Sequence, residues 1–120
     1  MKRRDRSRCP VCHTLDIVGD KWTLLIIRDM LIGGKRHYRE FAASEGIATN
    51  ILADRLRMLA DHGIVTREDD PANGTQAIYL PTDKARALMP VLDAMTRWGL
   101  DYGPDHVRAP AGWDPAARAS

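Results

Sequence analysis

The chain has 120 residues, of which 44% are hydrophobic and 28% are charged, and this suits one globular domain with a single core. Its net charge of +2 excludes a uniformly basic surface, so a nucleic-acid site would have to come from local clusters of Lys and Arg. No apolar run approaches the ~20 residues of a membrane-spanning helix, and no apolar segment follows the basic N-terminus as in a secretory signal, which predicts a cytoplasmic protein with no membrane partner.

The first eight residues carry five Lys or Arg side chains against Asp5. We expect residues 1–8 to be a flexible basic arm that either contacts DNA phosphates or has no function. Pro10 then opens a predicted short helix, which Gly19 ends. Cys9 and Cys12 lie at the start of this helix, and in a reducing cytoplasm we expect them not to form a structural disulfide.

A strongly apolar helix is predicted over residues 21–31, with Asp20 as its N-cap. Apolar side chains surround most of this helix, so we expect it to lie at the buried centre of the domain. Lys35, Arg36 and Arg39 follow it and place positive charge directly before the next helix. In a helix-turn-helix, this is where the protein meets the DNA backbone.

Residues 38–63 have the pattern of two helices, at 38–44 and about 49–62, with a turn at Gly46. The inward face of the second helix shows amphipathic spacing and consists of Leu52, Leu56 and Leu59. Short or polar side chains form its outward face, namely Asn50, Ala53, Asp54 and Arg57. This pattern is typical of a recognition helix in the DNA major groove, although an αα-hairpin in any helical domain would share it.

After Gly63, apolar and polar residues alternate with a period of two, which is the pattern of a β-strand. Residues 64–68 and 75–80 are predicted strands, and Pro71 with Asn73-Gly74 is predicted to form the turn between them. Helix, turn, helix, strand, turn, strand is the order of a winged helix. We therefore predict a mainly α fold with one small β-hairpin, the wing, at about residues 64–80.

A last helix is predicted over residues 83–102, with Thr82 as its N-cap and a kink at Pro90. An apolar stripe runs along it and consists of Leu88, Val91, Leu92, Met95, Trp98 and Tyr102. The stripe either packs against a second copy of the chain or folds back on Trp22 and the first helix, and we favour the second copy. Residues 104–120 are rich in Pro, Ala, Gly and Arg, and we expect them to form a flexible tail.

Several motifs follow one another in a recognisable order. In the first half they are Cys9-Pro10-Val11, Leu15-Asp16, Gly19-Asp20-Lys21-Trp22-Thr23-Leu24-Leu25-Ile26, Arg28-Asp29 and Arg39-Glu40-Phe41. In the second half they are Gly46-Ile47-Ala48-Thr49-Asn50-Ile51-Leu52, Arg55-Leu56-Arg57, His62-Gly63-Ile64-Val65, Leu88-Met89-Pro90-Val91-Leu92 and Trp98-Gly99. Over residues 9–103 the chain resembles the HxlR-type winged-helix transcriptional regulators, which are related to the MarR group.

The resemblance implies a sequence-specific DNA-binding regulator of transcription, often a repressor, and not an enzyme. In this family the N-terminal and last helices form a homodimer interface, which here assigns Val11 and Leu15 to the interface together with the apolar stripe. The resemblance also implies that residues 48–57 enter the major groove of double-stranded DNA. Because a dimer binds two half-sites, we expect the operator to be an inverted repeat.

Individual roles on the DNA follow from side-chain chemistry. Asn50 could pair with adenine, Arg57 could reach guanine or phosphate, and Asp54 could accept from cytosine N4. Arg55 makes either a phosphate contact or an intramolecular ion pair. The wing has Arg67 beside an acidic tip, which argues against insertion of a wing arginine into the minor groove. The predicted DNA-binding residues are Lys35, Arg36, Arg39, Ala48, Thr49, Asn50, Ala53, Asp54, Arg55, Arg57 and Arg67.

Cys9, Cys12 and His13 match the C-x-x-C-H pattern of covalent haem attachment, but no export signal accompanies them. A zinc site lacks a second pair of ligands, so we expect neither a metal nor a cofactor. Some members of the resembled family sense oxidants with a cysteine at the position of Cys9. Here the helix start and nearby Arg8 favour the thiolate, and Cys12 could act as the resolving thiol. The alternative is that both thiols are small packing residues.

Two other functions remain as alternatives to a DNA-binding regulator. An enzyme is disfavoured because the sequence shows no nucleophile with a base, no phosphate-binding loop and no metal set. A winged helix that binds protein in place of DNA is the second alternative. A small-molecule or oxidant effector would need a pocket between the winged domain and the dimer helices, where Trp22, Trp98 and Tyr102 either line it or pack in the core or interface.

Overall fold

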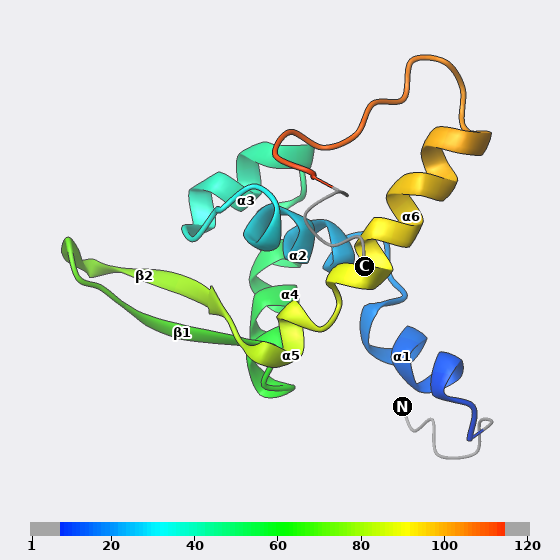
Figure 1. The fold of residues 1–120 in the computed structure, drawn as a ribbon. Coiled ribbons are helices and arrows are strands. Elements are labelled where there is room, and N and C mark those ends of the chain that lie inside the picture. The colour runs from blue at the N-terminus through cyan, green and yellow to red at the C-terminus, as the bar shows by residue number, and fades with distance from the viewer. Residues whose placement is uncertain (1–7, 115–120) are drawn as a thin grey trace.

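The computed structural model describes residues 8–114, so the predicted basic arm lies almost entirely outside the described residues. The fold is mainly α with one antiparallel β-hairpin, as predicted (Figure 1). In chain order the elements are α1 (Pro10–Val18), α2 (Thr23–Leu31), α3 (Tyr38–Glu45), α4 (Thr49–Asp61), β1 (Val65–Asp70), β2 (Asn73–Pro81), α5 (Asp83–Arg86) and α6 (Met89–Tyr102).

The core forms around α2, as its apolar sequence predicts. Ile27 of α2 is fully buried, and it lies in one cluster with Phe41 of α3 and the predicted inward face of α4. Burying a side chain of this size contributes about 1.5–3 kcal/mol. The ring of Phe41 meets the ring of Tyr79 of β2 edge to face at a centroid distance of 6.4 Å, so the hairpin also packs on the helical core.

The first turn of α2 is set by Asp20. Its Oδ2 accepts hydrogen bonds from the backbone N–H of Trp22 at 3.0 Å and of Thr23 at 3.2 Å, and the fully buried Thr23 hydroxyl donates to Oδ1. Asp20 therefore caps the turn that leads into α2, while the N-cap position itself falls on Trp22, two residues after the predicted one. The helix begins at Thr23 and not at Lys21, because the carboxylate holds the preceding residues in a turn.

The turn between α3 and α4 agrees with the sequence prediction. Gly46 ends α3 with φ of 71°, the left-handed conformation that favours glycine. The Tyr38 hydroxyl donates to the backbone oxygen of Thr49 at 2.6 Å, which ties the start of α3 to the start of α4. The orientation of α4 is thus fixed by a polar contact in addition to its buried leucines.

The wing consists of β1 and β2, paired antiparallel from Val65 opposite Pro81 to Asp69 opposite Ala77. The predicted turn at Asn73-Gly74 is wrong, because both residues belong to β2. The chain reverses at Pro71-Ala72, where Asp70 Oδ1 accepts from the Ala72 N–H at 2.9 Å. An irregularity in the register between Asp69 and Asp70 accommodates this shorter reversal.

The predicted continuous helix over residues 83–102 is also wrong. Two helices form, and Pro90 lies in the first turn of α6, where its missing N–H costs no helical hydrogen bond. A helix running through Pro90 would have lost that bond and placed its ring against the carbonyl one turn earlier. The chain therefore breaks at Ala87-Leu88.

Residues 104–114 of the predicted tail contact the helical part of the chain, and we call them the C-terminal strap. The strap runs back from the end of α6 towards α2 (Figure 1). Trp113 Nε1 donates to Asp93 Oδ1 at 2.7 Å, and its ring lies 5.6 Å from the guanidinium of Arg97. Gly112 has φ of +89°, and a Cβ there would lie 2.9 Å from the backbone oxygen of Ile32. These contacts join the strap to α6 and to the end of α2.

Candidate nucleic-acid interface

The N-terminal half of α4 presents a surface suited to base recognition. Ala48, Thr49, Asn50, Ala53 and Arg57 are all exposed. Within residues 8–114, no hydrogen bond or ion pair engages the side chain of Thr49 or Asn50. The structure therefore brings these predicted residues to one outward face and leaves their polar groups available to a partner.

The carboxylate of Asp54 on the same face is neutralised within the chain. Arg55 Nη1 lies 2.5 Å from Asp54 Oδ2, and Arg55 Nε donates to Asp20 Oδ2 at 2.9 Å. Of the two roles predicted for Arg55, the intramolecular ion pair is the one present. Arg57 lies at 4.0 Å from Asp54, and its side chain is 66% exposed. Arg57 is therefore the cation on this face that remains free to reach outward.

Asp20 thus serves two elements at once. Partial burial raises the pKa of Asp20, but hydrogen bonds from Thr23, Trp22 and Arg55 outweigh burial and leave that pKa below its usual value. The hydrogen bond to Asp20 raises the pKa of Arg55 in turn. The ion pair between Asp20 and Arg55 therefore connects the start of α2 to the middle of α4.

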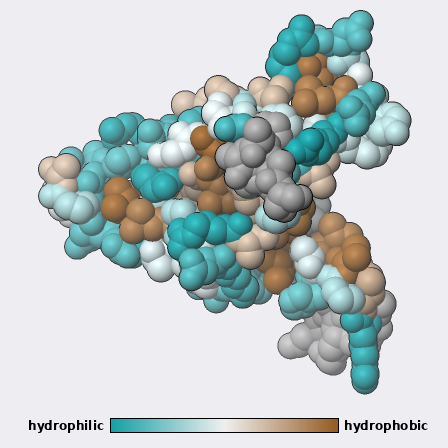
Figure 2. Space-filling model, in the orientation of Figure 1, coloured by the Kyte–Doolittle hydropathy of each residue, from teal (hydrophilic) through white to brown (hydrophobic). Residues whose placement is uncertain are grey.

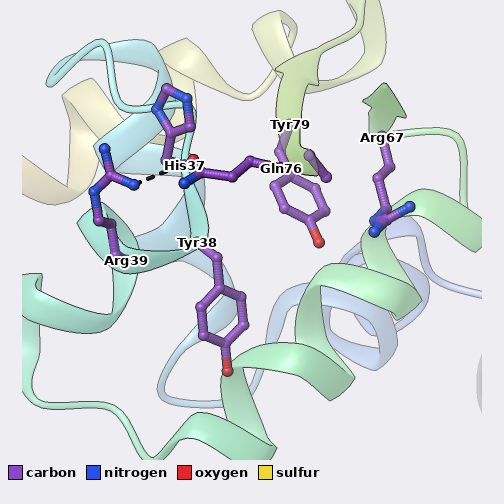
Figure 3. Close-up of a pocket in the computed structure, with 7 residues that line it drawn as sticks. His37, Tyr38, Arg39, Arg67, Gln76 and Tyr79 are labelled. Atoms are coloured by element: carbon purple, nitrogen blue, oxygen red, sulfur yellow. Dashed lines mark hydrogen bonds between the residues drawn. The ribbon is translucent and has the colours of Figure 1, made fainter. Parts of the chain in front are cut away.

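An open cleft of about 380 Å³ lies between the start of α3 and the wing (Figure 3). Arg39 enters it from α3 and Arg67 from β1, and Arg39 Nη1 donates to Gln76 Oε1 at 3.2 Å. A second groove of about 230 Å³ shares Arg67 and Tyr79 and adds Arg57 of α4. The residues lining the first cleft are His37, Tyr38, Arg39, Arg67, Gln76, Ala77 and Tyr79. Three arginines from three elements thus line neighbouring grooves, an arrangement that can hold a phosphate backbone.

The sequence reasoning missed Tyr38, Gln76 and Tyr79 as cleft residues. Tyr38 lies between two predicted basic residues, and Tyr79 is the aromatic residue of the second strand, so both were visible as candidates. Their convergence depends on the wing folding against α3. The backbone N–H of Tyr79 donates to the backbone oxygen of Arg36 at 2.8 Å, a contact between segments far apart in the chain.

Two basic residues of the loop between α2 and α3 turn towards their own chain. Arg36 Nη1 donates to the backbone oxygens of Met30 at 3.0 Å and Lys35 at 2.8 Å, and so satisfies one carbonyl at the end of α2 and one in the loop. These contacts engage Nη1 of Arg36 within the chain, and its phosphate contact stays a prediction. Lys35 Nζ lies 4.0 Å from the buried carboxylate of Asp29, with its side chain 33% exposed.

A histidine that the sequence reasoning did not assign links α3 to the wing. His37 Nε2 lies 2.8 Å from Asp70 Oδ2, and His37 Nδ1 lies 3.2 Å from Glu40 Oε1. Hydrogen bonds to Asp70 and then Glu40 raise the pKa of His37. The spacing of His37 and Glu40 matches a capping box and could have been noticed, but no local pattern indicates Asp70 as the second partner.

The two cysteines lie where predicted, in the first turn of α1. Cys9 is the exposed N-cap residue of α1, and Cys12 is half-buried. Hydrogen bonds from the backbone N–H groups of Cys12 and Val11 hold the pKa of the Cys9 thiol below its usual value. Among residues 8–114, no group of three or more His, Cys, Asp or Glu side chains is arranged to hold a metal ion.

Two helices leave apolar side chains on the surface. Hydrophobic patches cover α1 and the outer part of α6 (Figure 2). Trp98 and Tyr102 are 67% and 75% exposed, and their rings lie 5.4 Å apart. Leu92 must be removed from the predicted stripe because it is buried in the core of its own chain, and Leu88 is half-buried beside it. The exposed members of the predicted set are Val11, Leu15, Val91, Met95, Trp98 and Tyr102.

A small pocket lies between α1 and the winged part of the chain. It has a volume of about 150 Å³, and its lining includes His13, Ile64 and Leu88. Trp22, Trp98 and Tyr102 do not line it. Trp22 packs against the core, while the other two lie on the exposed face of α6.

A helix-turn-helix followed by a β-hairpin that packs against it defines the winged helix-turn-helix class of proteins. Residues 17–107 match the HxlR-like helix-turn-helix family, and the chain belongs to this family. None of the helices within residues 8–114 is both long enough and apolar enough to cross a membrane.

Known proteins agree with this assignment. An uncharacterised HTH-type transcriptional regulator of Synechocystis sp., sll1512, is 35% identical over 94 residues, which are 78% of this chain and 70% of the relative. The crystal structure of PA1607, a proposed transcription factor, matches with a TM-score of 0.80 and 42% identity over 88% of this chain and 75% of that one. The redox regulator HypR in its oxidised form matches with a TM-score of 0.70 and 33% identity, over 80% and 99% of the respective chains. The chain is a helix-turn-helix transcriptional regulator and not an enzyme.

Proposed function

We propose that the chain is a homodimeric repressor that binds an inverted-repeat operator with sequence specificity. The observation that carries the proposal is the outer face of α4, where the side chains of Thr49 and Asn50 are exposed and unengaged within residues 8–114. The buried leucines on the opposite face, Leu52, Leu56 and Leu59, fix the position of α4, so the orientation of these polar side chains is also fixed.

In this proposal the recognition helix reads bases and the neighbouring clefts hold the backbone. Asn50 pairs with adenine through N6 and N7, and Arg57 reaches guanine or phosphate. Arg39 and Arg67 contact phosphates from opposite sides of the cleft between α3 and the wing. Asp54, already paired with Arg55, repels phosphate less than a free carboxylate would.

The homodimer is supported by the unpaired apolar faces of α1 and α6. Val11 and Leu15 are 63% and 53% exposed on α1, and Met95 and Trp98 are 52% and 67% exposed on α6. Exposed apolar surface of this extent favours association with a second copy. Pairing through these helices gives a two-fold molecule with two α4 helices, and hence two half-sites. A promoter-binding regulator of this kind would act in the cytoplasm.

The test is selection of genomic DNA fragments by the purified, reduced protein at near-physiological salt. Enrichment of a few intergenic sites that contain two inverted half-sites is the expected result. Binding that vanishes at modestly raised salt and is competed equally by unrelated duplex would instead favour a winged-helix module that binds protein. Repression is tested by placing the enriched site upstream of a reporter, with expression expected to fall when the protein is present.

An oxidant is the effector that the chain supports best, with Cys9 as the sensing thiol. Its lowered pKa favours the thiolate, and Cys12 lies one helical turn away, while the relative HypR is a redox regulator. Oxidation by diamide would join the two sulfurs with loss of two electrons and two protons, which reduce diamide to its hydrazine. Diamide should then release the operator from the reduced protein. Release that persists in Cys9→Ser would reject this role, and both thiols would be packing residues.

A further inference from the structure

The ring of His37 lies between carboxylates from two separate elements. Nε2 faces Asp70 Oδ2 at 2.8 Å, near the far end of the wing, and Nδ1 faces Glu40 Oε1 at 3.2 Å, in the first turn of α3. The His37 and Asp70 side chains are only 27% and 13% exposed. The contact therefore joins segments 33 residues apart in a partly desolvated place.

Only a protonated ring can donate to both carboxylates at once. An ionised carboxylate accepts hydrogen bonds only, and a neutral imidazole has one N–H, whereas the imidazolium ion donates from both nitrogens. Arg39 of α3 interacts with Asp70, Arg67 of β1 lines the same cleft as His37, and Arg36 turns to the carbonyl of Met30. Both carboxylate partners favour the charged ring, in agreement with the raised pKa of His37.

The link acts at a distance from the other attachments of the wing. At its base, the wing packs on the core through the buried Val65, and midway the Tyr79 N–H donates to the Arg36 oxygen at 2.8 Å. Asp70 is the last residue of β1, immediately before the reversal of the hairpin. A two-stranded hairpin that is held only at its base is free to bend. The His37 contact and the hydrogen bond from Arg39 Nη1 to Gln76 Oε1 hold the outer part against α3.

We infer that His37 is a positioning residue that sets the orientation of the wing relative to α3, and with it the separation of Arg39 and Arg67 across the cleft that receives a DNA strand. The inference rests on the proposed function. It assigns to His37 no contact with DNA and makes the affinity for the operator depend on the protonation of this ring.

The sign of the pH dependence follows from the direction of each shift. The folded pKa of His37 is raised, so its contribution is complete below the ordinary value of ~6.5 and is lost as the pH rises through the raised pKa. The pKa of Asp70 is lowered mainly by the hydrogen bond from His37. The pKa of Glu40 is lowered mainly by the hydrogen bond from the Arg36 N–H. Their contribution is complete above the ordinary values of ~3.9 and ~4.3 and is lost as the pH falls through the lowered values. The link is therefore complete in mildly acidic solution and weakens on the alkaline side, where a neutral ring can donate to only one of the two carboxylates.

The first test uses the free protein and does not depend on DNA. With ¹³C-labelled histidine, the His37 ring should titrate above ~6.5, and amide exchange at Tyr79 should accelerate through the same midpoint. Asp70→Asn removes one carboxylate charge and should lower this midpoint. The control is His106→Gln, which replaces an exposed histidine on the strap and should leave the midpoint unchanged. A midpoint at the ordinary value, or one that Asp70→Asn does not move, overturns the inference.

The second test measures fluorescence anisotropy of the duplex obtained from the genomic selection. Wild-type affinity should fall about fivefold as the pH rises through the His37 midpoint, at the low end of coupling between sites in one protein. His37→Gln should bind weakly with a flat profile, and Asp70→Asn, which leaves the α3 cap intact, should shift the profile to lower pH. If the His37 midpoint is raised but the affinity for the duplex stays constant as the pH passes through that midpoint, the inference is overturned and the proposed function is not. Absence of binding to any duplex at every pH overturns the proposed function, and the inference with it.

Discussion

Replacement of Asp20 tests whether one carboxylate joins the cap of α2 to the recognition helix. Asp20→Ala removes an N-cap, which costs about 0.5–2 kcal/mol. It also leaves the Thr23 hydroxyl, which is 0% exposed, without its acceptor, at a cost of about 1–3 kcal/mol. The ion pair with Arg55, whose side chain is 29% exposed, adds at most about 1 kcal/mol. Because the three contacts share one carboxylate, we expect a total loss of about 2–4 kcal/mol in the free energy of unfolding.

Urea unfolding at one fixed protein concentration measures this loss, since the apparent stability of a dimer depends on concentration. Asp83→Ala is the matched control, because Asp83 also begins a helix and pairs with Arg86 but is fully exposed. The Asp20 contribution should be constant above the ordinary aspartate pKa of ~3.9 and should disappear as the pH falls through the lowered pKa of Asp20.

A double-mutant cycle separates the contacts of Asp20. In a Thr23→Val background the buried hydroxyl is absent, so Asp20→Ala should cost less there than in the wild type. The reasoning would be refuted if Asp20→Ala cost no more than Asp83→Ala, or if its cost were the same in both backgrounds. The first result would mean that the contacts of Asp20 add little stability, and the second that its contribution does not depend on the Thr23 hydroxyl.

Three further substitutions test the remaining contacts. Asn50→Ala should relax the preference at one operator position by about 1–3 kcal/mol per half-site in a binding competition, whereas equal loss on all sequences would reject Asn50 as a base reader. Arg39→Gln should weaken binding to every duplex and reduce the slope of log K against log salt by about 1. Arg36→Gln should lower thermal stability and leave that slope unchanged. The reverse pattern would contradict the placement of these two residues. Trp113→Phe should lower the free energy of unfolding by about 1 kcal/mol through loss of the bond to Asp93, and an unchanged value would show that the strap adds no stability.

Much of the fold follows from local patterns in the sequence. The leucines of α4 recur at helical spacing, so the buried and outward faces of that helix were predictable residue by residue. Gly46 and Asp20 mark their turn and cap by chemistry that acts over two or three residues. The family motifs cover the same segments.

The errors arise where two strong local signals compete or where the partner is remote. Asn73-Gly74 is a strong turn signal, but Pro71 and the Asp70 side chain make an earlier reversal. Pro90 was expected to kink a helix, yet the start of a new helix accommodates proline better.

The remaining differences between prediction and structure come from contacts between residues that are far apart in the sequence. Arg36 was counted as a phosphate contact from its charge, but the chain folds so that backbone carbonyls take its donors. The strap looked flexible by composition because nothing local to Trp113 reveals Asp93, 20 residues earlier. No local pattern connects His37 with Asp70, 33 residues later, for the same reason.

The acidic outer part of the wing limits which base pairs of an operator the protein can distinguish. Glu68 and Asp69 are exposed, so the wing presents negative charge near its tip. A narrow minor groove in AT-rich DNA has an enhanced negative potential and repels such a tip. On the proposed function, base preference would then come from the outer face of α4 alone, and the sequence that flanks each half-site would be free to drift. A few substitutions on that face would be enough to transfer the regulator to a new set of promoters while the core, the cap at Asp20 and the pairing helices stay as they are.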